Sequence, residues 1–153
     1  MLDAIDRRIL QMLQEDGKMK IKEIAAELQM TNTPVFERIK RLERDGFIQS
    51  YTAIIDKQKL GFTLTAFCSV TLELHHKAYL DQFEAEVVKL PEVNACYHIA
   101  GMFDYLLKIH VQDMQHYQAF ITEKLASLAN IGRVQSSFVM TEVKASSALP
   151  LEV

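Results

Sequence analysis

The hydrophobic pattern of this 153-residue chain differs between its first fifty residues and the rest, and this difference limits the possible folds more than any other feature. Up to about residue 50, apolar residues recur every three or four positions, which is the spacing of amphipathic helices. From about residue 62, stretches in which apolar and polar residues alternate, the spacing of half-buried strands, are separated by stretches of helical spacing. We therefore predict a helical domain at residues 1–50, a strand or linker at 51–61, and an α/β domain at 62–153.

The first fifty residues predict three short helices. Asp3 is the expected N-cap of the first helix, because a short side-chain oxygen accepts from the free N–H groups of the first turn. Thr33 and Pro34 mark the start of the third helix, as a hydroxyl cap and a proline at the first helical position, where its missing N–H costs nothing. The predicted buried stripes are Ile5, Ile9, Met12 and Leu13, then Ile21, Ile24, Ala25 and Leu28, then Val35, Ile39 and Leu42.

Two short helices joined by about four residues, the second with exposed cations, are typical of a DNA-binding helix-turn-helix. The third predicted helix fits this role, because four cations lie within residues 38–44. Such cations neutralise phosphates, while the outer face of the helix reaches the bases. The alternative is a small helical bundle with a solvated charged face. The candidate DNA-binding residues are Lys20, Lys22, Thr31, Asn32, Thr33, Pro34, Phe36, Glu37, Arg38, Lys40, Arg41 and Arg44.

The remaining residues predict the order βαββαβ, a split ferredoxin-like arrangement. The first of these strands alternates from Leu64 to Leu74, after a separate strand at 49–56 that leaves the helical domain. Helices are expected at 77–90 and 114–128, the second with Asp113 as its cap. The fold class is thus α+β, with an N-terminal three-helix helix-turn-helix domain and a C-terminal ferredoxin-like domain. Further strands are expected at 93–99, 105–111 and 134–142.

A ferredoxin-like sheet has helices on one face only, so an apolar second face needs another cover. Strand parity places six residues on this open face, and their character favours packing against a copy of the chain. The alternative is a small-molecule pocket on the same face. The six residues are Phe67, Cys96, His98, Leu106, His110 and Val139.

Composition and motifs exclude several classes of function. The net charge of −3 argues against a general nucleic-acid coat. No phosphate-binding loop, zinc-protease or hydrolase motif occurs, and His75 and His76 are adjacent residues, which make poor joint metal ligands. We predict no enzymatic activity, catalytic residue, metal or cofactor. No apolar run approaches the ~20 residues of a membrane span, and the charged N-terminal residues are unlike a signal peptide, so a cytoplasmic protein is expected.

Taken together, these motifs resemble the Lrp/AsnC family of leucine-responsive, or feast/famine, regulators over essentially the whole chain. Each motif is weak alone, and their order and spacing make the resemblance specific. In the first domain they are IDRRIL (5–10), EIA (23–25), TPVFERIKRLE (33–43) and GFI (46–48). In the second they are GMFDYLL (101–107), SSFVM (136–140) and EVK (142–144).

The resemblance implies a bacterial or archaeal transcription regulator, associated with the nucleoid, whose helix-turn-helix binds double-stranded DNA. It implies dimers that pair through their sheets and assemble further, often to octamers. It also implies an amino-acid effector bound between dimers. The residues that it assigns to the effector site are Ala100, Gly101, Met102, Phe103, Asp104, Ser136 and Ser137.

The loop residues themselves support part of this assignment. Gly101 permits a close backbone approach because it lacks a Cβ, and Asp104 could accept from an α-ammonium group. The alternative is a plain hairpin turn with a capping aspartate. Met102 and Phe103 make the loop apolar, which suits a sulfur-containing or aliphatic amino acid. Lys20 stands where the family often has Ser or Thr, so the cap of the second helix is weaker here and Lys20 is available to phosphate.

Three classes of function remain, and we favour the first. It is a DNA-binding transcription regulator that responds to an amino acid. The second is an amino-acid-binding or assembly module whose helical segment contacts protein, and the third is a small enzyme with a ferredoxin-like core. Duplex binding whose logarithm falls linearly with log salt would distinguish the first class from the others.

Overall fold

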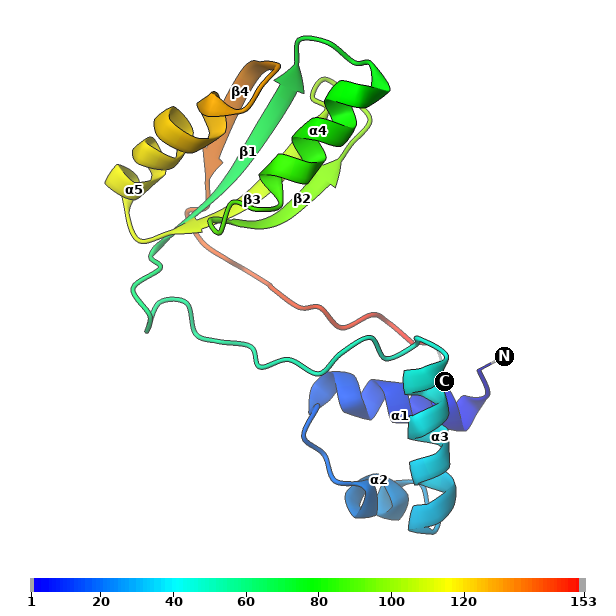
Figure 1. Cartoon of the computed structure of the whole chain (residues 1–153). Coiled ribbons are helices and arrows are strands. Elements are labelled where there is room, and N and C mark those ends of the chain that lie inside the picture. Colours follow the sequence, from blue (N-terminus) through cyan, green and yellow to red (C-terminus); the bar gives the residue numbers. More distant parts are fainter. Residues whose placement is uncertain (1, 152–153) are drawn as a thin grey trace. The chain divides into compact units, whose positions relative to one another are not determined.

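The computed structural model describes residues 2–151, which form two compact units (Figure 1). The first unit contains the chain up to Ile54 together with the segment from Lys144 onward, and the second runs from Ile55 to Val143. We predicted that the C-terminal segment belongs to the α/β domain. It lies instead with the helices, because the side-chain amide of Gln14 bonds both the N–H and the C=O of Leu149. Among residues 2–151, no helix is long and apolar enough to cross a membrane.

Helices α1 (Ala4–Glu15), α2 (Ile21–Glu27) and α3 (Asn32–Arg44) build the first unit. Asp3 caps α1 as predicted, since its side chain accepts from the Asp6 N–H at 2.8 Å. The Asp6 carboxylate accepts in return from the Asp3 N–H, which completes a capping box. The predicted apolar stripes meet in one core that contains Ile9, Met12, Ile24, Ala25, Val35, Ile39 and Leu42.

Helix α3 begins earlier than predicted. Its N-cap is Thr31, so the predicted cap Thr33 lies inside the helix and Pro34 is the third helical residue. Proline is tolerated there because the N–H groups of the first turn have no partner within the helix. Asn32 and Thr33 are therefore exposed on the first turn of α3.

Strands β1 (Leu64–Leu72), β2 (Val93–His98), β3 (Tyr105–Val111) and β4 (Ile131–Phe138) form one antiparallel sheet in the second unit. The strand order is β2-β3-β1-β4, and the chain order of strands and helices is the predicted βαββαβ. This confirms the predicted fold class.

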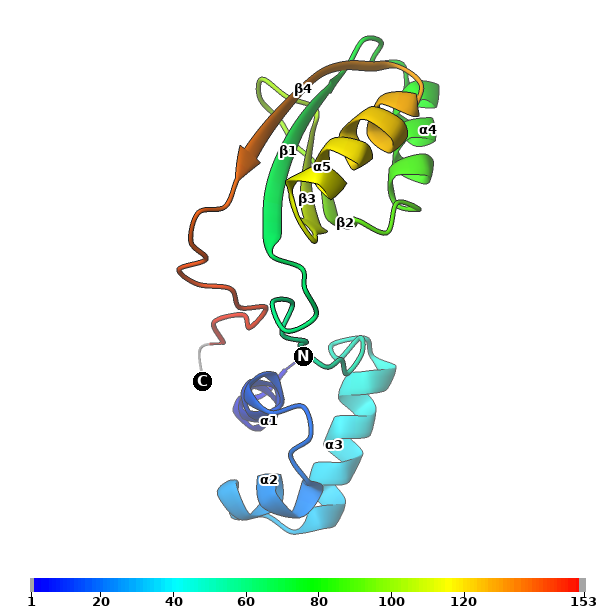
Figure 2. The same ribbon diagram turned by 90° about the vertical axis from the view of Figure 1, so that its left-hand side faces the viewer.

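Helices α4 (Lys77–Val87) and α5 (Met114–Ala119) both lie on one face of this sheet, as Figure 2 shows. The second predicted helix is not uniform, since α5 continues into a π-helical turn (Phe120–Lys124) and a 3-10 turn (Leu125–Ser127). Asp113 caps α5 as expected. The core beneath the helices contains Ala66, Cys68, Val70, Leu72, Phe83, Val87, Tyr105, Leu107, Ile109, Val111, Tyr117, Phe120 and Leu125.

A β-bulge in β2 overturns part of the predicted open face. The pairing with β3 shifts between Val93 and Ala95, and one extra residue in a strand reverses the parity of every residue after it. Cys96 therefore packs against the core, and His98 stacks on Tyr105 with ring centroids 4.7 Å apart. Both residues face the helices, so the prediction that they lie on the open face was wrong. The open face contains Phe67, Leu106 and His110 as predicted, with Tyr97 in addition.

The predicted strand at 49–56 is replaced by chain without regular secondary structure. A strand needs a neighbour for its N–H and C=O groups, and none of the strands described between residues 2 and 151 pairs with this segment. Its side chains Ile54 and Ile55 are exposed. Strand β1 also ends at Leu72, which leaves Leu74 exposed rather than in the core.

Candidate nucleic-acid interface and ligand-binding loop

Helix α3 holds its cations in two groups that differ in their partners, and Lys40 and Arg44 pair with neighbours on or beside α3. Their side chains are 56% and 74% exposed. Lys40 Nζ lies 2.8 Å from Glu43 Oε2, and Arg44 Nε lies 2.9 Å from Asp45 Oδ1. Pairs between such exposed side chains contribute little free energy, so both cations can exchange these partners for a phosphate oxygen.

Arg38 and Arg41 form the second group, and both bind carboxylates of α1. Arg38 Nη1 lies 2.7 Å from Asp3 Oδ2 and 2.7 Å from Asp6 Oδ1, and Arg41 Nη2 lies 2.5 Å from Asp6 Oδ2. The Asp6 side chain is 1% exposed. The hydrogen bond from the Asp6 N–H and then that from Arg38 lower the pKa of Asp3. The two arginines thus have partners within the protein, and their contact with DNA stays a prediction.

Phe36 is an aromatic side chain on the outer part of α3, 41% exposed. Lys40 Nζ lies 5.8 Å from the centroid of its ring. Glu37, the next residue, and Thr33, about one turn earlier, are exposed as well, whereas Pro34 is half-buried. A phenyl ring on the outer face of such a helix is suited to contact the methyl group of thymine in the major groove.

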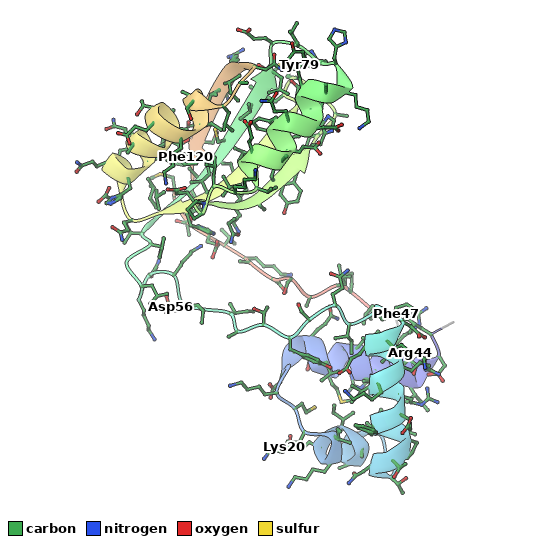
Figure 3. The ribbon with its side chains drawn as sticks, viewed as in Figure 1. Lys20, Arg44, Phe47, Asp56, Tyr79 and Phe120 are labelled. Carbon is green, nitrogen blue, oxygen red and sulfur yellow. The ribbon has the colours of Figure 1, made fainter. Side chains whose placement is uncertain are left out.

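The start of α2 adds two more cations, Lys20 and Lys22, and both are exposed. The Lys20 side chain makes no capping bond, and the Lys20 N–H donates instead to Glu23 Oε2 at 2.8 Å. Its ammonium group is therefore not used in capping. Figure 3 marks Lys20 at the start of α2 and Arg44 on the last turn of α3. Thr31, the N-cap of α3, likewise makes no side-chain capping bond.

The predicted effector loop, residues 100–104, joins β2 to β3 and is held by Asp104. The Asp104 N–H donates to Val70 O at 2.9 Å. Its Oδ2 accepts from the Leu72 N–H at 2.7 Å and lies 3.0 Å from His75 Nε2. One carboxylate therefore fastens the loop to the end of β1. Gly101 has φ 149°, a conformation that side chains other than glycine rarely adopt.

The rest of the loop offers an apolar edge. Met102 is 86% exposed and Ala100 is exposed, whereas Phe103 is half-buried. The guanidinium group of Arg133, on β4, lies 5.8 Å from the centroid of the Phe103 ring. An apolar side chain beside a charged group is a suitable arrangement for a small zwitterionic ligand.

The structure does not bring the two predicted serines to this loop. Ser136 pairs with Cys68 and Ser137 with Phe67 on β1, whereas the loop meets β1 further along, at Val70 and Leu72. Adjacent residues of a strand point to opposite faces. Ser136 lies on the face of the helices, where its Oγ accepts from the Tyr117 hydroxyl. Ser137 lies on the open face, so the two serines cannot serve one site within one chain.

Two residues with a clear role were absent from the sequence candidates. Asp6 lies three positions before Ile9, on the buried face of α1, and a charged residue in an apolar stripe was the signal that could have revealed it. His75 contacts Asp104, but nothing in the sequence spacing links a loop residue to one so far along the chain. No group of metal-binding side chains occurs within the described part of the chain.

A helix-turn-helix unit with exposed cations, followed by a ferredoxin-like unit, is the architecture of a transcription regulator with a ligand-binding domain. Family comparisons agree with this division. Residues 2–49 match the family described as winged helix-turn-helix DNA-binding, and residues 65–149 match the Lrp/AsnC ligand binding domain. The chain belongs to the Lrp/AsnC family of transcriptional regulators.

Characterised relatives span the whole chain. The leucine-responsive regulatory protein of Escherichia coli K12 is 40% identical over 151 residues, which cover 99% of this chain and 92% of that protein. The DNA-binding transcriptional activator DecR of the same organism is 36% identical over 152 residues, which cover 99% and 100% of the two chains. These relatives are regulators and not enzymes.

Solved structures show the same two-unit chain. A transcriptional regulator from Neisseria meningitidis, crystallised as an L-Met complex, has a TM-score of 0.94 at 34% identity, with 99% of this chain and 97% of that chain covered. An AsnC family regulator from Agrobacterium tumefaciens has a TM-score of 0.93 at 35% identity, with 98% and 97% covered.

Proposed function

We propose that α3 and the start of α2 bind the major groove and phosphates of duplex DNA. The exposure of Lys40 and Arg44 on α3, each with only a weak partner, is the observation that most directly supports this surface. The other side chains of the proposed surface are Lys20, Lys22, Thr31, Asn32, Thr33, Phe36 and Glu37.

The proposed effector is an amino acid with an apolar side chain, bound at the loop 100–104. Met102 and Phe103 supply the apolar contact, and Asp104 holds the loop in place. The Neisseria relative was crystallised with L-Met, and another relative is named for leucine, so these two amino acids are the first to test. No further cofactor is proposed.

Self-association is part of the proposal. The sheet face opposite α4 and α5 holds half-buried Phe67 and Leu106 and exposed Tyr97, an apolar group that a second copy could cover. Dimers formed in this way would assemble further, to octamers, with the amino acid bound between dimers. Ser137 lies on the same open face and would be covered with it. The assembled regulator would act in the cytoplasm, at the nucleoid.

Regulation would follow from linkage. An amino acid that binds one assembly more tightly than another shifts the population toward that assembly, and its DNA affinity with it.

The test is a binding titration on a duplex from the region upstream of the gene. It is repeated at several salt concentrations and with each amino acid in turn, L-Met and L-Leu first. We expect log affinity to fall linearly with log salt, with a slope of several phosphates, and one amino acid to shift the affinity. Binding at low salt that no amino acid alters would overturn the effector proposal. Absence of binding would overturn the DNA surface and favour a helical unit that contacts protein.

A further inference from the structure

Asp6 lies at the centre of four charged side chains that join α1 to α3, here called the Asp6 cluster: Asp3, Asp6, Arg38 and Arg41. Both Asp6 carboxylate oxygens are in use, since Oδ1 lies 2.7 Å from Arg38 Nη1 and Oδ2 lies 2.5 Å from Arg41 Nη2. Asp3 Oδ2 lies 2.7 Å from the same Arg38 nitrogen. Charge-assisted hydrogen bonds of this length are the strong class.

Burial of the Asp6 carboxylate separates this cluster from the other ion pairs of α3. The Asp6 side chain is 1% exposed, whereas those of Glu43 and Asp45, the partners of Lys40 and Arg44, are 29% and 40% exposed. The arginines of the cluster are themselves 23% and 41% exposed. A buried carboxylate is stable only while its partners stay in place, because an unpaired charge away from water is costly. Arg38 and Arg41 therefore cannot leave Asp6 for a phosphate at the low cost that applies to an exposed cation.

The partners of the α3 cations, and not their spacing, divide them into two groups. Arg38 and Arg41 bind the carboxylates at the start of α1. Lys40 and Arg44 line the same hollow as these two arginines, but their partners lie on or beside α3 itself. The cations within residues 38–44 thus share one surface and differ in what holds them.

We infer that Asp6 is a positioning residue of the DNA-binding unit. It fixes α3 against α1 through Arg38 and Arg41, and it keeps these two cations out of the set that neutralises DNA phosphates. This inference rests on the proposed DNA binding. Its consequence is that the salt dependence of binding reflects Lys40 and Arg44, with Lys20 and Lys22, whereas sequence specificity depends on the orientation that Asp6 gives to α3.

The test compares Arg38→Gln with Arg44→Gln, the same chemical change at two positions of one helix. Duplex binding is titrated at several salt concentrations, and thermal unfolding is followed in the same samples. Arg44→Gln should reduce the slope of log affinity against log salt by about 0.9, the loss of one phosphate contact, and leave the unfolding temperature unchanged. Arg38→Gln should leave the slope unchanged and lower the unfolding temperature.

Arg38→Gln should also reduce the sequence specificity of DNA binding. We expect the ratio of affinities for the upstream duplex and for a scrambled duplex to fall by roughly tenfold, as α3 loses its fixed orientation. A purely structural ion pair would lower the unfolding temperature and leave this ratio unchanged. That result would overturn the positioning role.

Asp6→Asn provides the reverse test, because it keeps the shape of the side chain and removes the charge that holds both arginines. On the scrambled duplex its slope should become steeper by roughly one to two, since the freed cations can reach phosphates. An unchanged slope would contradict the inference. If Asp6→Asn does not fold, the comparison of Arg38→Gln with Arg44→Gln still tests the inference.

The outcomes separate the inference from the proposal beneath it. A wild-type protein that binds no duplex at low salt overturns the DNA-binding proposal and this inference together. A wild-type protein that binds, with Arg38→Gln reducing the slope as much as Arg44→Gln, overturns the inference alone.

Discussion

Asp104 holds the proposed effector loop in place through partners within the protein. Its Oδ2 accepts from the Leu72 N–H and lies within 3.0 Å of His75 Nε2, so the carboxylate already has partners in the protein. An α-ammonium group would have to share this carboxylate. Removing the side chain would also deprive the Leu72 N–H of its acceptor, so an alanine variant mixes two effects.

The conservative variant Asp104→Asn separates them, because the amide oxygen still accepts from the Leu72 N–H while the negative charge is lost. We expect the amino-acid effect on DNA binding to weaken by about tenfold or more, the loss of one charge-assisted hydrogen bond. Affinity in the absence of an amino acid should not change. Titrations of DNA with and without L-Met or L-Leu measure both quantities. A full amino-acid response in this variant would exclude a role for the charge.

Phe36→Ala removes an exposed ring and no charge. The salt slope should therefore stay constant, while affinity for the upstream duplex falls by about 1–3 kcal/mol, the range for one lost base contact. A duplex in which thymine is replaced by uracil, which lacks the methyl group, provides the control. Wild-type protein should lose affinity on that duplex, whereas Phe36→Ala should bind it as tightly as it binds the duplex with thymine. Equal losses in both proteins would mean that the ring contacts something other than the methyl group.

At the scale of elements, spacing predicted the helices and strands well because it reflects the face that each element buries. The stripes of α1 to α3 and of β1 and β3 are buried as predicted. The same spacing gave the wrong face for Cys96 and His98, because the bulge in β2 adds a residue that parity cannot reveal. The candidate site was less predictable still, since the partners of Arg38 and Asp104 come from distant positions in the chain.

Helix α4 is expected to depend on Phe83, which is 1% exposed and packs against Tyr105 with ring centroids 4.6 Å apart. Phe83→Ala should destabilise the second unit by about 3–5 kcal/mol, because it leaves a cavity in the core. Urea unfolding monitored by circular dichroism measures this loss. Ala85→Ser, at an exposed position of the same helix, is the control and should unfold at the wild-type midpoint.

His110 on β3 should make the second unit sensitive to pH. Desolvation and then the charges of Lys57 and Lys108 lower its pKa below the usual 6.5, while Thr65 Oγ1 lies 2.9 Å from Nδ1. The unfolded chain therefore takes up a proton more readily than the folded one, so stability is complete above pH 6.5 and decreases as the pH falls toward the lower folded pKa. Unfolding midpoints at a series of pH values should show this decrease.

In His110→Gln the decrease should be smaller, because the titrating ring is absent. Glu142 opposes the shift at His110, and Glu142→Gln should therefore make the decrease larger. A His110→Gln protein with the same pH profile as wild type would assign the effect to other groups.

At the scale of the whole molecule, the open sheet face should determine self-association. Phe67→Asp places a charge on this face and leaves the core under the helices intact, because Phe67 points away from it. We expect light scattering to give the mass of a monomer and circular dichroism to remain that of the wild type. The control is Tyr79→Asp, an exposed position on α4, which should keep the wild-type mass. An assembly that survives Phe67→Asp would place the interface elsewhere.

The pair of hydrogen bonds between Gln14 and Leu149 holds the C-terminal segment on the helical unit, so the chain passes between the two units twice, at Ile54–Ile55 and at Val143–Lys144. During synthesis the ribosome releases α1 to α3 long before Leu149, so the helices must first form without this contact. A protease that cuts once near residue 57 would break the covalent path between α3 and β1. The larger fragment would still hold the helical unit through its tail, by one amide side chain, so a nicked molecule would separate only once that pair opens.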